Sequence, residues 1–149
     1  MRVVPDTNVL ARAARRGTLA ARVIAQLLSA PHLLILSPAL VAEMTRVLRY
    51  PWLRAMHGLD DPGIDTYVSQ LQAAALVLSV GPGDIVPVVA NDPDDDWVVA
   101  TAVVGAAEVI CTRDTDFDPP AVRAYCQQHG IRILTDLELL NLLAAPPGP

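Results

Sequence analysis

Short apolar runs alternate along this chain with longer segments in which apolar residues recur every three or four positions. The first pattern is typical of buried β-strands, and the second is typical of helices that bury one face. The short runs predict strands over residues 2–5, 33–36, 76–80, 85–89, 109–112 and 131–134. The longer segments predict helices over residues 19–28, 38–50, 62–75, 97–104, 120–129 and 136–143.

Several boundaries of these elements carry signals of their own. Ser37 is suited to cap a helix whose first residue is Pro38, and Pro51 is expected to end that helix. Pro5 lacks a backbone N–H and should close the first strand, which then meets a polar loop at Asp6-Thr7-Asn8. Strands that alternate with helices predict an α/β fold with a mainly parallel sheet, in which the carboxyl ends of the strands share one edge.

The length of 149 residues fits one domain, which we place over residues 1–144, followed by a frayed Pro-rich tail at 145–149. Hydrophobic residues make up 52% of the chain, so wholesale disorder is excluded. No apolar stretch approaches the roughly 20 residues that span a bilayer, and the acid at position 6 comes too early for a signal peptide. Two cysteines without metal-binding spacing fit free thiols in the cytoplasm, where we expect this protein to reside.

Charge is distributed unevenly, although its net value is only −5. All 11 basic residues are arginine, and eight of them lie in residues 1–54 beside only two acids, which gives this part a balance of +6. The rest of the chain has a balance of −11. A global basic field for nonspecific nucleic-acid binding is therefore absent, whereas a local basic face opposite an acidic cluster stays compatible with the sequence.

Acidic residues interrupt otherwise apolar elements at four places. Asp6 ends the first strand, and Glu43 lies inside a helix with apolar residues on both sides. A run of acids at 92–96 leads into the apolar segment that begins at position 97, and Asp114 and Asp116 follow a later strand. A carboxylate at the end or in the interior of a buried element is costly unless it is paired or bound to a metal.

Ordinary pairing explains part of this pattern, since Arg46 follows Glu43 by three residues and Arg113 precedes Asp114. A solvated turn and helix cap is the interpretation that we favour for the first two acids of the 92–96 run. Several carboxylates forced together nevertheless repel one another. A hard divalent cation such as Mg²⁺ or Mn²⁺ neutralises them through oxygen ligands, and it stabilises charge on a phosphoryl oxygen.

The four acidic segments resemble, in order, the four motifs of the PIN-domain family. Residues 3–10 (VVPDTNVL) match its strand followed by Asp-Thr-Asn, and residues 37–43 (SPALVAE) resemble its second motif, a helix that carries a Glu. Residues 92–102 resemble the third motif and residues 109–117 the fourth. The segment 130–135, with the Glu-containing helix after it, also fits the VapC-like branch, which comprises the toxins of toxin–antitoxin pairs. The resemblance covers nearly the whole chain.

This resemblance implies a three-layer α/β/α sandwich around a mainly parallel sheet. It also implies a metal-dependent ribonuclease. Carried over residue by residue, the catalytic and metal-binding acids are Asp6, Glu43, Asp95 and Asp116. Asp114 joins them as a further metal ligand.

Two positions within these motifs have close competitors. Asp95 is preferred to Asp96 because the family's acid stands seven residues before the small residue of its Ala-Thr-Ala helix, which is Ala102 here. Some branches have Asn where Asp114 stands, which favours Asp116 as the fourth acid. Both pairs of alternatives stay open at this point.

The reaction implied by the resemblance is hydrolysis of RNA phosphodiester bonds with one or two Mg²⁺ or Mn²⁺ ions. Thr7 and Asn8 would hydrogen-bond to the acids or to the scissile phosphate. Arg12, Arg15 and Arg16 would face RNA phosphates near the first motif, unless they form an ordinary solvated surface. The toxin branch further implies a cognate antitoxin that blocks the acidic cleft, and a homodimer.

Other classes of protein fit less well. A dinucleotide-binding domain needs a glycine-rich turn after the first strand, where Asp6-Thr7-Asn8 stands instead. A phosphorylation receiver would need a Lys, which the chain lacks, and a dehalogenase-like phosphatase would have Asp at position 8. The open alternative is a catalytically weak PIN-like module that binds RNA or a protein.

Overall fold

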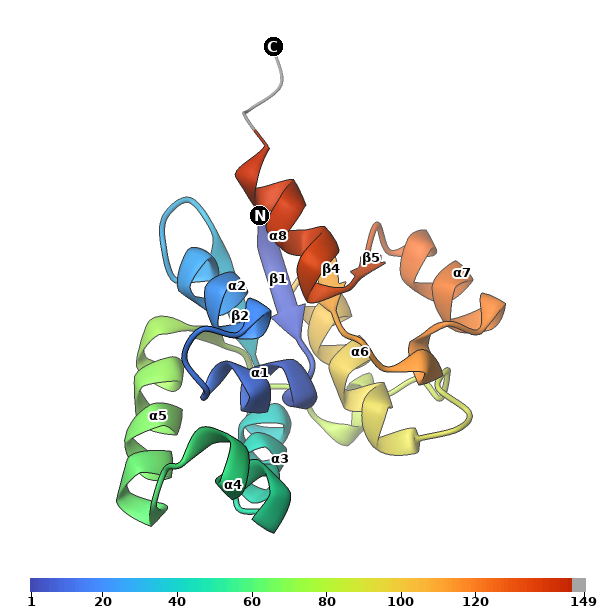
Figure 1. The fold of residues 1–149 in the computed structure, drawn as a ribbon. Coiled ribbons are helices and arrows are strands. Elements are labelled where there is room, and N and C mark those ends of the chain that lie inside the picture. Colours follow the sequence, from blue (N-terminus) through green and yellow to red (C-terminus); the bar gives the residue numbers. More distant parts are fainter. Residues whose placement is uncertain (146–149) are drawn as a thin grey trace.

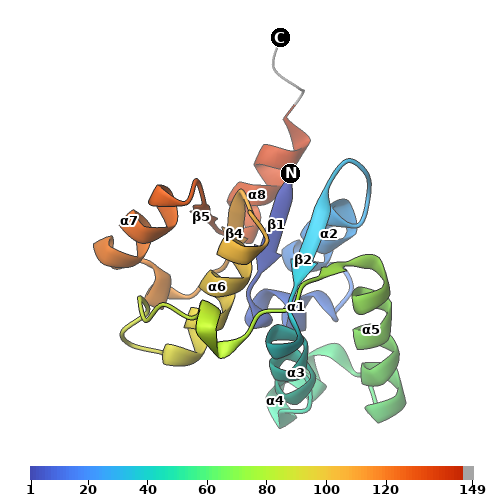
Figure 2. The same ribbon diagram turned by 180° about the vertical axis from the view of Figure 1, so that it is seen from behind.

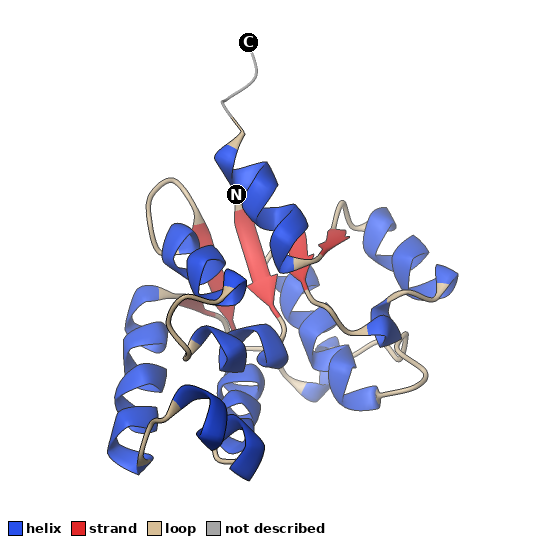
Figure 3. Ribbon diagram, in the orientation of Figure 1, coloured by secondary structure: helices blue, strands red, loops and turns tan. Residues whose placement is uncertain are grey.

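The apolar runs of the sequence form one parallel sheet in the computed structural model, which describes residues 1–145. Its strands are β1 (Arg2–Pro5), β2 (Leu33–Leu36), β3 (Leu76–Val77), β4 (Val109–Cys111) and β5 (Arg132–Leu134). They lie in the order β3–β2–β1–β4–β5, and each neighbouring pair is parallel (Figures 1 and 3). The first strand of the chain is thus the central strand of the sheet.

Helices connect these strands and cover both faces of the sheet. The α-helices are α1 (Thr7–Ala13), α2 (Leu19–Leu27), α3 (Pro38–Val47), α4 (Pro51–His57), α5 (Asp61–Ala74), α6 (Asp96–Val104), α7 (Pro120–Gln128) and α8 (Asp136–Ala144). Short 3-10 helices occur at η1 (Pro82–Asp84), η2 (Pro93–Asp95) and η3 (Thr115–Phe117). Ser37 precedes α3 as the predicted cap, and Thr135 forms a capping box with Glu138 at the start of α8.

Alternate side chains of the central strands divide the core into two halves. Val3 of β1 packs in a cluster with residues of α1, α2, α3, α5 and α8. Val4 packs on the opposite face, in a cluster with residues of α6 and α7. Figure 1 shows α1, α2 and α8 in front of the sheet, and Figure 2 shows α6 in front when the molecule is seen from behind. The expected three-layer α/β/α sandwich is therefore confirmed.

The order of the strands changes direction between β1 and β4. After β1 the chain continues outward through β2 and β3, and it then returns to the other side of β1 for β4 and β5. Pro5 pairs with Cys111 at the carboxyl ends of β1 and β4, and the N–H of Asp6 donates to the carbonyl of Cys111 at 2.9 Å. In open parallel sheets, ligands bind at this edge, where the connections diverge.

Two helices of the structure differ from the sequence-based expectation. The polar loop predicted at Asp6-Thr7-Asn8 is wrong, because Thr7 already begins α1 and Asp6 caps it. Pro51 was expected to end the preceding helix, but α3 ends at Val47 and Pro51 begins α4 instead. Proline is favoured at the first position of a helix, since that position needs no intrahelical N–H donor.

The two strands predicted at 76–80 and 85–89 also differ from the structure, since the first is shorter than expected and the second does not form. β3 contains only Leu76 and Val77, and residues 85–89 form no strand. The backbone N–H groups of Val88 and Val89 donate instead to one carboxylate oxygen of Asp96, at 2.9 and 2.8 Å. A buried carboxylate thus satisfies the backbone donors that would otherwise need a neighbouring strand.

Most of the frayed tail expected at 145–149 lies outside the described residues. Within residues 1–145, no helix has both the length and the apolar character needed to cross a bilayer.

Replacing Asp96 with Ala should destabilise the fold. Asp96 is buried and accepts two backbone N–H groups, so its loss would leave those donors without a partner. We expect a loss of about 2–3 kcal/mol in the free energy of unfolding, measured by urea denaturation. The exposed neighbour Asp94, replaced by Ala, serves as the control. Equal stability of both variants and the wild type would contradict this role for Asp96.

Candidate metal centre

Asp6 is fixed in place between the first and fourth strands. It follows β1 directly, and one of its carboxylate oxygens accepts the backbone N–H of Val9 at 2.8 Å in the first turn of α1. Its other oxygen accepts a hydrogen bond from the hydroxyl of Thr112, the residue after β4. Burial, reinforced by the negative charge of Asp114, raises the pKa of Asp6 in spite of these hydrogen bonds. The fold therefore holds a carboxylate where its charge is costly.

Asp95 lies at the end of η2, directly before α6, with one oxygen that is incompletely satisfied. Its Oδ2 is buried and has no hydrogen-bond partner among the described residues. Burial raises the pKa of Asp95 to about 8, and neighbouring negative charges add to the rise. Those charges belong to Asp92, Asp114, Asp6 and Asp116. An unpartnered acceptor surrounded by anions is the environment that a cation would stabilise.

The tightest group of carboxylates contains Asp92, Asp95 and Asp116. Each offers an oxygen, and these atoms all lie within 4.8 Å of one another. Asp116 also accepts a hydrogen bond from the side-chain amide of Asn91 at 3.2 Å. Three carboxylate oxygens at this spacing, one of them from the acid with the orphaned buried atom, form an oxygen-only donor set of the kind that hard divalent cations prefer. The residues present therefore fit a divalent metal.

Asp114 lies beside this group and links it to Asp6. Its Oδ1 accepts the backbone N–H of Asp116 at 2.9 Å, and its own N–H donates to the hydroxyl of Thr112 at 2.9 Å. The same hydroxyl donates to Asp6. The loop after β4 thus presents two carboxylates, with Asp116 in the tight group and Asp114 on the side of Asp6.

Glu43 belongs to α3, the helix that follows β2. Its side chain is 29% exposed and pairs with Arg46 at 3.4 Å, as the spacing of the two residues predicts. Burial raises the pKa of Glu43; Arg46 opposes this rise, and the charges of Asp94, Asp92 and Asp6 add to it. Glu43 and Asp94 also line the same hollow. The structure thus brings Glu43 within electrostatic reach of the other acids.

Asp95 and Asp96 have different surroundings, although they are adjacent in sequence. Asp96 is 3% exposed, and one of its oxygens is bonded to the backbone of residues 88 and 89. Asp95 faces the acidic group and has an oxygen without a partner among residues 1–145. Of the two, Asp95 alone belongs to the group of three carboxylates within 4.8 Å.

The place of Asp92 in this group was not predicted, since a solvated turn and helix cap was expected for it. Asp92 does cap η2, where its side chain accepts the N–H of Asp94 at 3.0 Å. It also belongs to the tight carboxylate group. The signal available in the sequence was Pro93, which starts the 3-10 turn that brings Asp92 and Asp95 to the same side.

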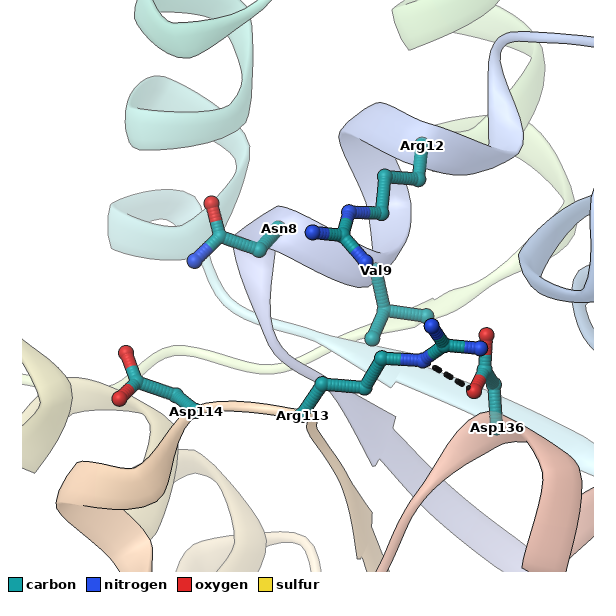
Figure 4. A pocket seen from close by; sticks show the side chains of 6 residues that line it. All are labelled: Asn8, Val9, Arg12, Arg113, Asp114 and Asp136. Atoms are coloured by element: carbon teal, nitrogen blue, oxygen red, sulfur yellow. Dashed lines mark hydrogen bonds and ion pairs between the residues drawn. The ribbon is translucent and has the colours of Figure 1, made fainter.

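The remaining predicted residues lie on or after α1. Thr7 is buried and Asn8 is exposed in the first turn of α1, and Arg12 lies one turn later. Asn8 and Arg12 line a pocket together with Asp114 (Figure 4). Arg15 and Arg16 are exposed in the turn that follows α1, beyond the end of the helix opposite to Asp6. The structure therefore brings Arg12, but not Arg15 and Arg16, to the pocket beside the acids.

Comparison with known families agrees with this geometry. Residues 2–116 match a family model described as PIN domain, which covers more than half of the chain and includes all the acids named above. A search of curated proteins found no match.

The stability of the metal-free protein should fall as the pH rises. Because the folded state raises the pKa of Asp95 from 3.8 to about 8, it binds this proton more tightly than the unfolded state does. The stability associated with the proton is then present below about pH 4 and is lost as the pH rises towards about 8. Replacing Asp95 with Asn should flatten the pH dependence of Tm measured in EDTA. Identical profiles for wild type and Asp95→Asn would contradict the assignment.

Divalent cations should reverse this loss. Mn²⁺ binds the ionised carboxylates of the folded state, so it should raise Tm. The rise should be larger near pH 8 than near pH 6, because at pH 6 the ion must displace a proton from Asp95, whose pKa is about 8. The shift should disappear in Asp95→Asn and persist in Asp118→Asn, which changes an exposed acid of the neighbouring loop. The shift in Tm is measured by thermal unfolding at millimolar concentrations of Mn²⁺. An equal shift in both variants would count against a site at Asp95.

Proposed function

Because this chain belongs to the PIN-domain family, whose members are generally metal-dependent nucleases, we propose that it is a metal-dependent endoribonuclease that hydrolyses RNA phosphodiester bonds. We propose further that it acts in the cytoplasm as the toxin of a toxin–antitoxin pair. The observation that carries the nuclease proposal is the buried, unpartnered oxygen of Asp95 within a group of carboxylates, among the residues that the structure describes.

The proposed metal ligands are the acids that the fold gathers at this edge. They are Asp6, Glu43, Asp95, Asp114 and Asp116, with Asp92 as an addition suggested by its distance from two of them. A bound Mg²⁺ or Mn²⁺ would supply a Lewis acid that stabilises the charge developing on the phosphoryl oxygens. The oxygen-only donor set suits either ion.

The protein's own groups have distinct parts in this proposal. Thr112 and the N–H of Val9 hold Asp6 in a fixed orientation, so that its carboxylate is arranged before substrate arrives. Asn8 is exposed on the first turn of α1, where its amide would donate to a phosphate oxygen of the RNA. Asn91, which donates to Asp116, would orient that carboxylate. Of these four groups, Thr112, Val9 and Asn91 position acids, and Asn8 would contact the substrate.

The toxin assignment is supported by the sequence after the fourth motif. Within it, residues 130–135 and the Glu-containing helix after them resemble the toxin branch of the family, and they form β5 and α8. We propose an antitoxin that inhibits the enzyme by covering the acidic cleft, for which an inserted Arg would be chemically suited because it pairs with carboxylates. A homodimer is part of the same proposal.

An RNA cleavage assay tests the nuclease proposal. Wild-type protein should cleave single-stranded RNA with Mg²⁺ or Mn²⁺ and lose this activity in EDTA. Asp95→Asn should reduce cleavage at least about tenfold, a loss that even outer partners of metal ligands typically cause. Asp118→Asn is the matched control, since Asp118 is exposed and pairs with Arg123.

Two outcomes would reject the nuclease. One is cleavage that is indifferent to the chelator. The other is equal cleavage by Asp95→Asn and Asp118→Asn. RNA binding without cleavage by the wild type would instead favour the noncatalytic binding module.

A further inference from the structure

A second polar pocket adjoins the carboxylate group on the side of α1 and α8. It has a volume of about 110 Å³ and is lined by Asn8, Val9, Arg12, Arg113, Asp114 and Asp136. Figure 4 shows Arg12 reaching from α1, while Arg113 reaches across from the loop after β4. Asp114 contributes to this pocket and also to the electrostatic surroundings of Asp95. The pocket therefore neighbours the candidate metal centre, and Asp114 is the residue that takes part in both.

Arg113 is held in an unexpected direction. The sequence suggested a pair with its neighbour Asp114, but its Nε donates to Asp136 at 2.6 Å, across the pocket at the start of α8. Asp136 is 2% exposed, whereas the Arg113 side chain is 44% exposed. The acid is thus buried and the arginine reaches solvent. This contact draws the cation away from Asp114 and leaves that carboxylate free of an arginine partner among the described residues.

The ion pair uses only one of the donor positions of the guanidinium. In residues 1–145, the terminal nitrogens of Arg113 make no hydrogen bond, and the side chain of Arg12 makes neither a hydrogen bond nor an ion pair. An anchored guanidinium with free N–H groups is suited to bind a phosphate, because its fork matches two phosphate oxygens. Two such groups on one pocket provide positive charge beside a cleft that is otherwise acidic.

We propose that Arg12 and Arg113 form a binding subsite for a phosphate of single-stranded RNA next to the scissile one, and that Asp136 positions Arg113 for this purpose. The proposal rests on the proposed function, since it assigns the neighbouring phosphate of the same substrate. A polyanion that approaches several carboxylates meets repulsion, and cations beside the acids offset it without occupying the metal site. Arg113 offsets the repulsion and leaves the metal site free, because Asp136 holds it to one side of the acidic group.

The subsite can be measured apart from catalysis by RNA binding in EDTA. The probe is a short fluorescein-labelled single-stranded RNA, and the readout is the salt dependence of Kd by fluorescence anisotropy. Arg12→Ala should lower the slope of log Kd against log salt by about 0.7, the value expected for one lost phosphate contact on a single strand. Arg113→Ala combined with Asp136→Asn should lower it by a similar amount of about 0.7.

The double variant is used for two physical reasons. Removing Arg113 alone would leave a buried charge on Asp136 without a partner, which is strongly destabilising. Replacing both residues leaves net charge unchanged, so a smaller slope then reports a lost local contact. Arg132→Ala is the control, because Arg132 is exposed at the amino end of β5, at the opposite edge of the sheet. Its slope should equal that of the wild type.

The positioning part of the proposal is tested by Asp136→Asn alone. In this variant Arg113 keeps its charge, but its Nε–H faces a neutral amide oxygen in place of a carboxylate and is held less firmly. The salt slope should therefore persist while the KM for RNA rises several-fold with little change in kcat. The amide oxygen of the substituted side chain can still accept the N–H of Leu137, which Asp136 accepts at 3.0 Å, so the start of α8 is preserved. A lowered Tm with unchanged Kd and KM would show a purely structural role and overturn this part.

The outcomes separate the subsite from the nuclease. If the wild type cleaves RNA but the double variant has the salt slope of Arg132→Ala, the subsite is rejected and the nuclease stands. If the slope falls as expected in a protein that cleaves no RNA, the nuclease is rejected and a polynucleotide-binding pocket stands. Failure of the wild type to bind RNA even at low salt rejects the subsite.

Discussion

Mutual repulsion among carboxylates is the constraint that this fold has to satisfy. Asp92, Asp95 and Asp116 approach within 4.8 Å, and Asp6 and Asp114 add their charge to the surroundings of Asp95. Such an arrangement persists only if the backbone fixes it, because free side chains would separate. The parallel sheet supplies this rigidity, since it ends two neighbouring strands at the same edge and packs helices against both faces.

Thr112 connects the parts of the site that the sheet brings together. Its hydroxyl donates to Asp6 and accepts from the N–H of Asp114, so one side chain orients an acid after β1 and an acid after β4. The arginines of the cleft are arranged so that they do not neutralise the group from within. Arg46 pairs with Glu43 at the rim, and Arg113 pairs with Asp136 away from the centre. The charge of the central acids is thereby left to a cation.

The sequence predicted those features that depend on local patterns. The α/β class, the order of most elements, and the positions of Asp6 and Asp114 after strands all follow from apolar periodicity and polar breaks. The short helix α1 was missed because its polar first residues resemble a loop, although Asp6 caps it. The membership of Asp92 in the carboxylate group was not predicted, because an acid that caps a short helix, as Asp92 caps η2, is an ordinary feature. The pair of Arg113 with Asp136 could not be predicted, since it depends on β5 lying beside β4.

The contact between Thr112 and Asp6 joins residues that are 106 positions apart. During translation, β1 therefore emerges long before the strand that completes its carboxyl edge. A nascent chain that stops before β4 lacks Thr112, Asp114 and Asp116 together, and it holds no assembled acidic group. The topology consequently delays assembly of the centre until most of the polypeptide has been synthesised.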